Sequence, residues 1–445
     1  MSSKPVVPSY RGKFGAAQAE RLLWRAGFGP RPGEAKALAK KGLSGAVKWL
    51  TDPPAEQLTG PEPRDDRGEA LAPADAVGHD HLWWLDRMVR TNRPLVEKMT
   101  LIWHDWFATS NQGVKSQQQM LDQNALFRDN WLGSFEQLLL GVTKDPAMLV
   151  WLSGNQNTKV APNENYGREL MELFTLGADR PGGYTEQDVR EQARALTGWT
   201  NRRSRAMGNY DFHYEPNLHD AGTKTIFGKS GAFDWEDSCR LCLSHPNHAS
   251  FFVRKLWDYF IPVAPTRSTQ TGLEKLYKAG YQVKPMVKAI LKHPALYNGA
   301  RMIKSPVVFN ASLLRATGRG IDSAQWFRLS SLAGQRLFYP PNVAGWNETR
   351  WLDTATFRGR WNLAAFALKP LALDPNRATA PSSANELLAR AEKFLGDPTL
   401  TGATGRVLLQ FAKSTLALAT DSGANVMIEN ALRQLIAVSP ELQTA

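Results

Sequence analysis

Apolar residues recur at helical spacing along most of the chain. The pattern is clearest in four segments, PLVEKMTLIWHDWFA, GSFEQLLLGVTKDPAMLVWL, NYGRELMELFTLG and TEQDVREQARALTGW. Long runs of strict two-residue alternation, which would indicate half-buried strands, are scarce. We therefore predict an all-α protein with a large multi-helix globular fold. One small β-hairpin is expected near residues 223–234, where Gly228 and Gly231 supply turn residues.

Several predicted helices end in a polar residue that is followed by proline. This arrangement occurs in VTKDPAML, CLSHPNHASFF, ILKHPALY and IAVSPELQ. Proline fixes the backbone angle φ and is well tolerated in the first turn of a helix. Each site should therefore end one helix and begin the next at an angle. Because the copies are irregularly spaced, we predict helix-turn-helix pairs and not a solenoid.

Two loop-like stretches interrupt the helical pattern. Residues 53–75 are rich in proline, glycine and alternating charges, and residues 370–383 are rich in proline, alanine and serine. We predict that residues 1–369 form the main body and that residues 370–383 form a linker. The amphipathic helices expected within residues 384–445 should then pack on the body.

The composition is that of an ordinary globular protein, with 42% hydrophobic and 22% charged residues. These values exclude a chain that is disordered throughout. The sequence has no apolar run of about 18 residues, so we expect no transmembrane segment. The beginning of the sequence lacks the apolar core and the cleavage site of a secretory signal. As written, the chain is expected to be cytoplasmic.

The net charge of +12 is concentrated near the start of the sequence. Residues 1–50 hold ten Lys or Arg residues against the two acids Glu20 and Glu34. These charges follow an amphipathic pattern, which is typical of a solvated helix face. We therefore do not expect nucleic acid as a partner, although the excess of positive charge is compatible with an anionic or polymeric substrate.

A series of ordered motifs resembles the bacterial DUF1800 family. In order and spacing, the similar segments are RLLWRAGFGP, PLVEKMTLIWHDWFATS, NENYGRELMELFTLG, YTEQDVREQARALTGW, LHDAGTKTIFG, FFVRKLWDYFI, RMIKSPVVFNASLLRATG and LFYPPNVAGWNETRWLDTATFRGRWNLA. The resemblance covers nearly the whole chain, down to the final IAVSPELQ. No activity defines this family. Many of its members look exported, so the resemblance implies export as the alternative to a cytoplasmic location.

The segment WHDWF provides the first candidate for catalysis. His104 and Asp105 are adjacent on a helix that is crowded with aromatic residues. An imidazole held in an aromatic pocket near a carboxylate can act as a general base. Side chains at adjacent helical positions diverge, however, which argues against His104 and Asp105 acting on each other. The alternative is a core histidine whose hydrogen bonds are satisfied.

A second candidate is the pair Glu169 and Glu172. Because they are three positions apart on a predicted helix, both carboxylates project from one side. Two carboxylates so close together can share a proton, bind a cation or pair with arginines. Arg168 lies beside them, and the next predicted helix carries Arg190 and Arg194. A structural network of glutamates and arginines is therefore the alternative interpretation.

The polar segment DFHYEPNLHDAGTKTIFG has the features of a loop that could build a site. It contains His213, Glu215, His219, Asp220 and Lys224. Converging ionisable groups on a loop are typical of functional sites on helical scaffolds. His219, Asp220 and Lys224 could bind an anionic group, whereas ordinary turn formation explains the same residues equally well.

Two cysteines and two histidines follow at intervals of three, namely Cys239, Cys242, His245 and His248. A zinc site would require the chain to turn between the two pairs, because one helical turn presents at most two ligands. The cysteines lie on an apolar helix, so we expect buried, unreactive thiols, with a zinc site as the alternative. Further along, Trp346 lies in a loop after two prolines, where an indole ring can stack on a sugar.

These groups lead to one principal hypothesis, a hydrolase-type enzyme with a cleft of histidines and carboxylates that acts on an anionic or polymeric substrate. The predicted catalytic residues are His104, Asp105, Glu169, Glu172, His219 and Asp220. The predicted substrate-binding residues are Arg168, Lys224, His213 and Trp346. A divalent metal ion is a candidate cofactor, because His104, Glu169 and His219 could hold it and it would lower the pKa of a bound water.

Two alternatives remain open from the sequence. One is a glycan-cleaving enzyme that uses paired carboxylates without a metal. The other is a non-enzymatic helical binding or assembly module, with Lys36, Lys40 and Lys41 among its contacts. The sequence contains no phosphate-binding loop, dinucleotide glycine fingerprint, HExxH or GxSxG motif, so those enzyme classes lack support.

Overall fold

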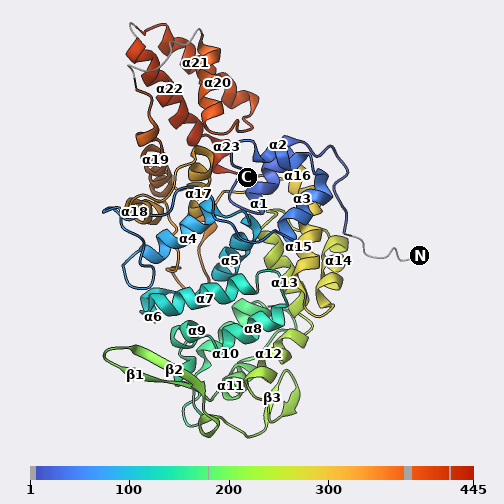
Figure 1. Cartoon of the computed structure of the whole chain (residues 1–445). Helices are drawn as coiled ribbons and strands as arrows, with labels where there is room; N and C mark the ends of the chain where they lie inside the picture. Colours follow the sequence, from blue (N-terminus) through green and yellow to red (C-terminus); the bar gives the residue numbers. More distant parts are fainter. Residues whose placement is uncertain (1–6, 179, 375–382, 420–421) are drawn as a thin grey trace, which may run out of the picture.

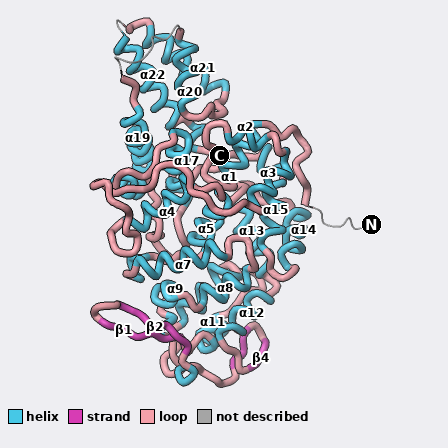
Figure 2. The backbone as a smooth tube through the Cα atoms, in the orientation of Figure 1, coloured by secondary structure: helices cyan, strands magenta, loops and turns pink. Residues whose placement is uncertain are grey.

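A computed structural model describes residues 7–178, 180–374, 383–419 and 422–445. Helices make up most of these residues, and the strands are confined to one end of the molecule (Figures 1 and 2). The predicted all-α class is confirmed, because the helical periodicity of the sequence is realised along most of the chain.

Helices are distributed over the whole length of the chain. The first group is α1 (Ala16–Arg25), α2 (Glu34–Ala39), α3 (Gly42–Thr51), α4 (His79–Arg90), α5 (Pro94–Trp106), α6 (Asn111–Val114), α7 (Gln117–Asp129), α8 (Phe135–Thr143), α9 (Pro146–Trp151), α10 (Glu164–Glu169) and α11 (Glu186–Ala195). The second group is α12 (Trp235–Ser244), α13 (His248–Asp258), α14 (Arg267–Lys278), α15 (Val283–Lys292), α16 (Pro294–Asn298), α17 (Pro306–Thr317), α18 (Gln325–Leu332), α19 (Thr354–Leu368), α20 (Ala384–Phe394), α21 (Gly402–Leu416), α22 (Ser422–Ala437) and α23 (Pro440–Gln443). Short 3-10 helices are η1 (Gly154–Gln156), η3 (Pro216–Leu218), η4 (Glu348–Arg350) and η5 (Lys369–Leu371), and η2 (Leu170–Thr175) is a π-helix.

The helix boundaries at proline follow the sequence prediction. Helices α9, α16 and α23 begin at Pro146, Pro294 and Pro440, each in the first helical position. The preceding Asp145 caps α9, because its side chain accepts a hydrogen bond from a backbone N–H of the first turn. Pro246 lies in the break between α12 and α13. Each of these prolines therefore separates two helices, as predicted.

Two antiparallel hairpins are present among the described residues. Strands β3 (Lys224–Ile226) and β4 (Lys229–Gly231) form the hairpin predicted near residues 223–234. The other hairpin pairs β1 (Trp199–Ser204) with β2 (Gly208–Tyr214). The DFHY segment belongs to β2, so the prediction that it is part of a loop is wrong. The strand pattern is obscured because the pairing register shifts between β1 and β2, so the two-residue alternation is interrupted.

Helix α5 lies between two hydrophobic clusters. Its residues Trp103 and Trp106 belong to a first cluster, which is built mainly from α1, α3, α8 and α10 to α15. Its Leu101 belongs to a second cluster, which is built from α4 and α17 to α22. A helix that is apolar on nearly all sides is expected in the interior of a large core. The two clusters therefore meet at α5.

The C-terminal helices share the second cluster with the rest of the chain. Leu387 of α20, Leu408 of α21 and Leu432 of α22 are buried together with Leu314 of α17. These helices form one end of the molecule in Figure 1. Of the predicted linker, residues 375–382 lie outside the described part of the chain.

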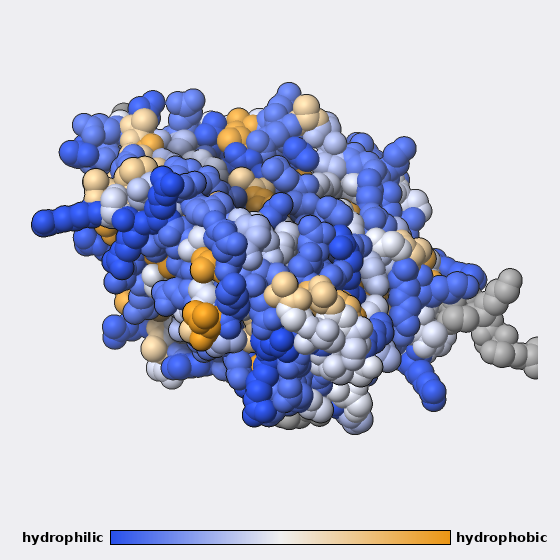
Figure 3. Space-filling view, turned by 90° about the horizontal axis from the view of Figure 1, so that it is seen from below, coloured by the Kyte–Doolittle hydropathy of each residue, from blue (hydrophilic) through white to orange (hydrophobic). Residues whose placement is uncertain are grey.

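The face of the molecule that Figure 3 shows is largely polar. In the face shown in Figure 3, hydrophilic residues predominate and the hydrophobic areas are small and separate. Among the helices that the structure describes, none combines the length and the apolar composition that crossing a membrane requires.

A buried carboxylate connects α5 to two neighbouring helices. Glu97 of α5 accepts hydrogen bonds from Arg128 Nε (2.8 Å), Arg87 Nε (3.2 Å) and the indole N–H of Trp84 (2.9 Å). Burial alone would raise the pKa of Glu97, but the hydrogen bond and charge of Arg128 and the charge of Arg87 outweigh it and hold the pKa below its ordinary value. Glu97 is therefore a charged residue that the core accommodates only through these partners.

We predict that Glu97→Gln lowers the free energy of unfolding by about 3 kcal/mol or more, because Arg128 loses its carboxylate partner and Arg87 keeps only Glu56. Urea-induced unfolding measures the effect. The control is Glu236→Gln, which removes a solvent-exposed ion pair with Arg240 and should cost less than about 1 kcal/mol. Equal effects of the two substitutions would contradict the assigned role of Glu97.

Candidate functional site

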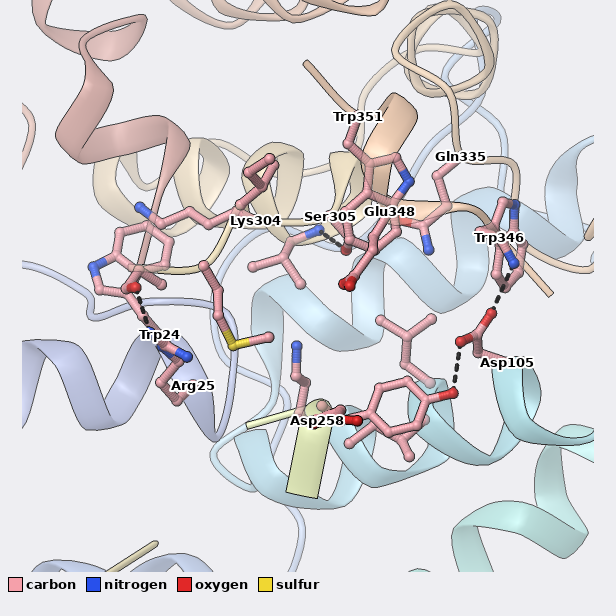
Figure 4. A pocket seen from close by; sticks show the side chains of 18 of the residues that line it. Trp24, Arg25, Asp105, Asp258, Lys304, Ser305, Gln335, Trp346, Glu348 and Trp351 are labelled. Atoms are coloured by element: carbon pink, nitrogen blue, oxygen red, sulfur yellow. Dashed lines mark hydrogen bonds between the residues drawn. The ribbon is translucent and has the colours of Figure 1, made fainter. Parts of the chain in front are cut away.

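A pocket with a volume of about 440 Å³ lies where α1, α5, α13 and the beginning of α17 meet. The segment that precedes α19, including η4, forms a further wall. We call it the central pocket (Figure 4). Its lining is mainly apolar, but charged side chains project into it from several elements. A hollow of this kind, with a few convergent polar groups, is the usual form of a small-molecule or catalytic site.

One face of α5 forms the floor of the central pocket. Lys98, Leu101, Ile102 and Asp105 all line it. These residues follow the spacing i, i+3, i+4 and i+7, which places them along one side of a helix. The helix thus presents an amine at one position and a carboxyl at another, separated by two apolar residues.

A second charged face comes from the end of α13. Lys255, Asp258 and Tyr259 line the central pocket, and they follow the spacing i, i+3 and i+4. The Lys255 Nζ donates a hydrogen bond to the Leu173 carbonyl oxygen (2.9 Å) and lies 4.4 Å from the ring centroid of Trp106. Both α5 and α13 therefore direct ionisable groups into the same space.

The segment before α19 closes the pocket with aromatic and acidic residues. Trp346, Glu348 and Trp351 line the pocket from this side. Asn347 caps the start of η4, because its side chain accepts a hydrogen bond from the backbone N–H of Thr349. Gly345 has a φ of +85°, and a Cβ at this position would overlap the Asp105 carboxyl. Only glycine fits both the backbone angle and the space.

Asp105 connects the three walls of the pocket. Its Oδ2 accepts a hydrogen bond from Tyr259 Oη (2.7 Å), and its Oδ1 accepts one from the backbone N–H of Trp346 (2.9 Å), as Figure 4 shows. Burial raises the pKa of the Asp105 carboxyl, and the two hydrogen bonds and the charge of Lys255 oppose that rise without cancelling it. Asp105 is therefore both a structural anchor and a carboxyl that retains a proton to a higher pH than usual.

Two further carboxyls belong to the central pocket. Burial raises the pKa of Asp258, although Arg254 Nε donates a hydrogen bond to it at 2.8 Å. The pKa of Glu348 is raised by partial burial at the pocket wall and then by the negative charges of Asp258 and Asp105. Three carboxyls with raised pKa values at one site are candidates for proton transfer.

The opposite end of the pocket is basic. Figure 4 shows Trp24, Arg25 and Lys304 at a distance from Asp105 and Trp346. Arg25 donates hydrogen bonds to three backbone carbonyls. The Lys304 Nζ donates to two carbonyls and lies 3.1 Å from a ring centroid of Trp24. Both side chains are thus engaged mainly by backbone carbonyls of the pocket wall, although in the described structure Arg25 Nε is buried without an acceptor.

Comparison with known protein families gives a match for this chain. A family model described as "Protein of unknown function (DUF1800)" matches residues 21–444. The chain belongs to the DUF1800 family. The match includes the elements that form the central pocket. Neither the curated proteins nor the solved structures contain a match to this chain.

The structure places two of the predicted site residues of this DUF1800 protein in the central pocket. Asp105 and Trp346 both line it, and a hydrogen bond joins them. His104 does not face the pocket. Its Nε2 accepts a hydrogen bond from the backbone N–H of Phe338 (3.1 Å), and its ring lies behind Trp346 at a centroid distance of 5.4 Å. Burial lowers the pKa of His104 to about 3, so the imidazole is neutral.

The predicted acidic pair of this DUF1800 protein lies outside the central pocket. Glu169 ends α10 and Glu172 lies in the π-helix η2, where it accepts a hydrogen bond from Tyr184 Oη (3.2 Å). Burial and the charge of Glu172 raise the pKa of Glu169. Arg168 pairs with Glu186 (2.8 Å) and not with the acidic pair. The two glutamates are close to each other, as expected, but they do not join Asp105.

The polar segment that follows β2 builds its own turn. Asp220 accepts a hydrogen bond from Arg194 Nε (2.7 Å), and the Lys224 Nζ donates to backbone carbonyl oxygens within this turn, including that of Asp220. The Nδ1 of His219 lies 3.2 Å from Thr197 Oγ1. These contacts match the structural alternative, in which the same residues stabilise a turn.

Within the described ranges, no group of three or more His, Cys, Asp or Glu residues is arranged to hold a metal ion. The predicted ligand set of His104, Glu169 and His219 is therefore not assembled in the DUF1800 fold. His213 lies on β2, where its Nδ1 is 2.8 Å from the backbone oxygen of Asp211.

Cys239 and Cys242 of α12 are buried free thiols, as expected. Cys239 Sγ lies 3.2 Å from Thr143 Oγ1, and Cys242 Sγ accepts a hydrogen bond from Gln192. Burial raises the pKa of the Cys239 thiol to about 12. Because the thiolate is the reactive form, this thiol is unreactive at neutral pH.

The ionisable pocket residues that sequence reasoning missed include Lys98, Lys255, Asp258 and Glu348. A signal for the first three was present. Charged residues spaced by three, four or seven positions within otherwise apolar helices indicate a polar stripe on a buried helix. In α5 and α13 that stripe faces the central pocket.

We predict that His104→Gln makes stability less sensitive to acid. The folded pKa of about 3 lies below the unfolded value of about 6.5, so the contribution of His104 is complete above about pH 6.5 and is lost as the pH falls toward 3. Between about pH 7 and pH 5 the variant should lose about 2 kcal/mol less than the parent protein.

Urea unfolding at several pH values measures this difference. The control is His213→Gln, which replaces a histidine of the hairpin strand β2 that lies outside the hydrophobic clusters. If the stability of the parent protein and that of the His104→Gln variant depend on pH in the same way, the pKa of His104 does not differ between the folded and unfolded states, and the prediction is wrong.

Proposed function

We propose that this DUF1800 protein is a hydrolase whose active site is the central pocket, and that it cleaves a polymer containing sugar residues. One observation supports this most directly. Asp105, Asp258 and Glu348 share a single pocket with the indole rings of Trp346 and Trp351. Paired carboxyls perform the acid and base steps of glycoside hydrolysis, and indole rings provide apolar faces for sugars.

Glu348 is the proposed general acid. Its raised pKa keeps the carboxyl protonated to a higher pH than that of an ordinary glutamate, and the protonated form is the one that can protonate a leaving oxygen. Partial burial of Glu348, and then the neighbouring charges of Asp258 and Asp105, raise this pKa. After bond cleavage Glu348 would be the carboxylate, and solvent protons would restore it.

Asp105 is the proposed partner on the other side of the reacting bond. Tyr259 and the Trp346 backbone fix its orientation, and each carboxylate oxygen keeps a further lone pair for an attacking water. In its ionised form Asp105 can accept a proton from that water. Lys255 lies near enough to favour this ionised form.

The walls of the pocket suit a polymeric substrate with polar edges. In the described structure the Trp351 indole N–H is buried without a hydrogen-bond acceptor. A sugar hydroxyl could accept this hydrogen bond. The proposed proton transfers are assigned entirely to carboxyl groups, so they require no metal ion.

We predict that Asp105→Asn and Glu348→Gln each lower kcat about 100-fold or more, because each removes one proton-transfer group. The assay is the release of reducing ends from a panel of neutral and anionic polysaccharides and cell-wall glycans. In the parent protein kcat should fall as the pH rises through the raised pKa of Glu348, since the acid must be protonated. Glu348→Gln should remove that limb of the profile.

Glu172→Gln is the matched control, since Glu172 is a partly buried glutamate outside the central pocket. It should retain the activity of the parent protein. Thermal unfolding of every variant separates loss of catalysis from loss of fold. Equal activity of Glu348→Gln and Glu172→Gln, or release of no reducing ends from any polymer, would contradict the proposal.

A further inference from the structure

Lys98 differs from the other lysines of the central pocket. Its side chain lines the pocket from α5, but in the part of the chain that the structure describes its Nζ has no hydrogen bond or ion pair. Lys255 and Lys304 each donate to backbone carbonyls and contact an indole ring. Lys98 is therefore the pocket lysine whose amine remains available to a ligand.

The surroundings of Lys98 favour the uncharged amine. Apolar residues of the same pocket, including Leu101, Ile102 and Val308, limit the solvation of an ammonium group. Burial, and then the positive charge of Arg25, lower the pKa of Lys98 to about 8. An amine with these neighbours is a nucleophile at a pH where an exposed lysine is almost fully protonated.

We propose that Lys98 is a nucleophile that captures a small aldehyde or ketone as an imine, which would be a second activity of the central pocket. Imine formation would take place in the same pocket as the proposed hydrolysis, but it does not depend on that hydrolysis. The geometry that carries the proposal is an unpartnered amine that lines a largely apolar pocket together with Asp258 and Glu348.

The chemistry balances without an oxidant, a reductant or a cofactor. The Lys98 nitrogen forms a bond to the carbonyl carbon, and the carbonyl oxygen takes up a proton. The resulting carbinolamine then loses water, so the carbon–oxygen bond breaks and both hydrogens of the original amine leave in that water. The pocket carboxyls can relay these protons because their pKa values are raised.

Trapping the imine tests this proposal on the full-length protein. The protein is incubated near pH 7 with acetone and sodium cyanoborohydride, which reduces an imine to a stable isopropyl amine. Proteolysis and mass spectrometry then give the labelling rate of each lysine. We expect Lys98 to be labelled at least about ten-fold faster than the exposed Lys36. The reason is that the lowered pKa of Lys98 leaves part of its amine neutral near pH 7, and the neutral amine is the nucleophile.

Lys255 serves as an internal comparison, since it lines the same pocket but its Nζ is hydrogen bonded. It should be labelled more slowly than Lys98. Labelling of Lys98 no faster than that of Lys36 would overturn the proposal, and so would a Lys98 rate that does not fall when the protein is unfolded in urea.

The variants Lys98→Met and Lys98→Arg should lose the fast label and keep the slow labelling of exposed lysines. Peptide mapping of the parent protein gives the decisive rate even if a variant fails to fold. Because labelling needs neither a polymer nor turnover, the imine proposal can fail while polysaccharide hydrolysis is observed, and the reverse result is equally distinguishable.

Discussion

The central pocket depends on how the Asp105 carboxyl is held. Its two oxygens accept hydrogen bonds from Tyr259 at the end of α13 and from the backbone of Trp346 before η4. A buried carboxyl is costly unless such partners are present, so this residue constrains where both segments can lie. Gly345 completes the constraint, because a side chain at that position would meet the carboxyl. One acidic group on α5 thus defines three walls of the site.

Burial changes the acids and the amines of the pocket in opposite directions. It raises the pKa values of Asp105, Asp258 and Glu348, and it lowers those of Lys98 and Lys255 to about 8. The physical reason is the same, since a poorly solvated environment disfavours whichever form is charged. The acids therefore keep their protons to a higher pH, and the amines lose theirs at a lower pH, than the same groups on the surface; the two proposed activities use these shifts.

The position of the pocket follows from the two hydrophobic clusters. Helix α5 contributes Trp103 to one cluster and Leu101 to the other, and the stripe with Lys98 and Asp105 lies along the pocket where they meet. Val308 of α17 belongs to the second cluster and lines the pocket, whereas α13 packs within the first. The site therefore forms only when the two parts of the core are packed against each other.

Local patterns in the sequence determined the helices, the breaks at proline, the small hairpin at β3 and β4, and the buried thiols, because each depends on residues close together in the chain. They also placed Asp105 and His104 on diverging sides of one helix. Which side would face a pocket was decided by partners far away in sequence, since Tyr259 and Trp346 lie 154 and 241 positions from Asp105. His104 accepts a hydrogen bond from Phe338 in the core, Asp220 pairs with Arg194, and Glu169 lies beside the like charge of Glu172. Spacing along a helix fixes the direction of a side chain, but only the packing of distant segments fixes what that side chain meets.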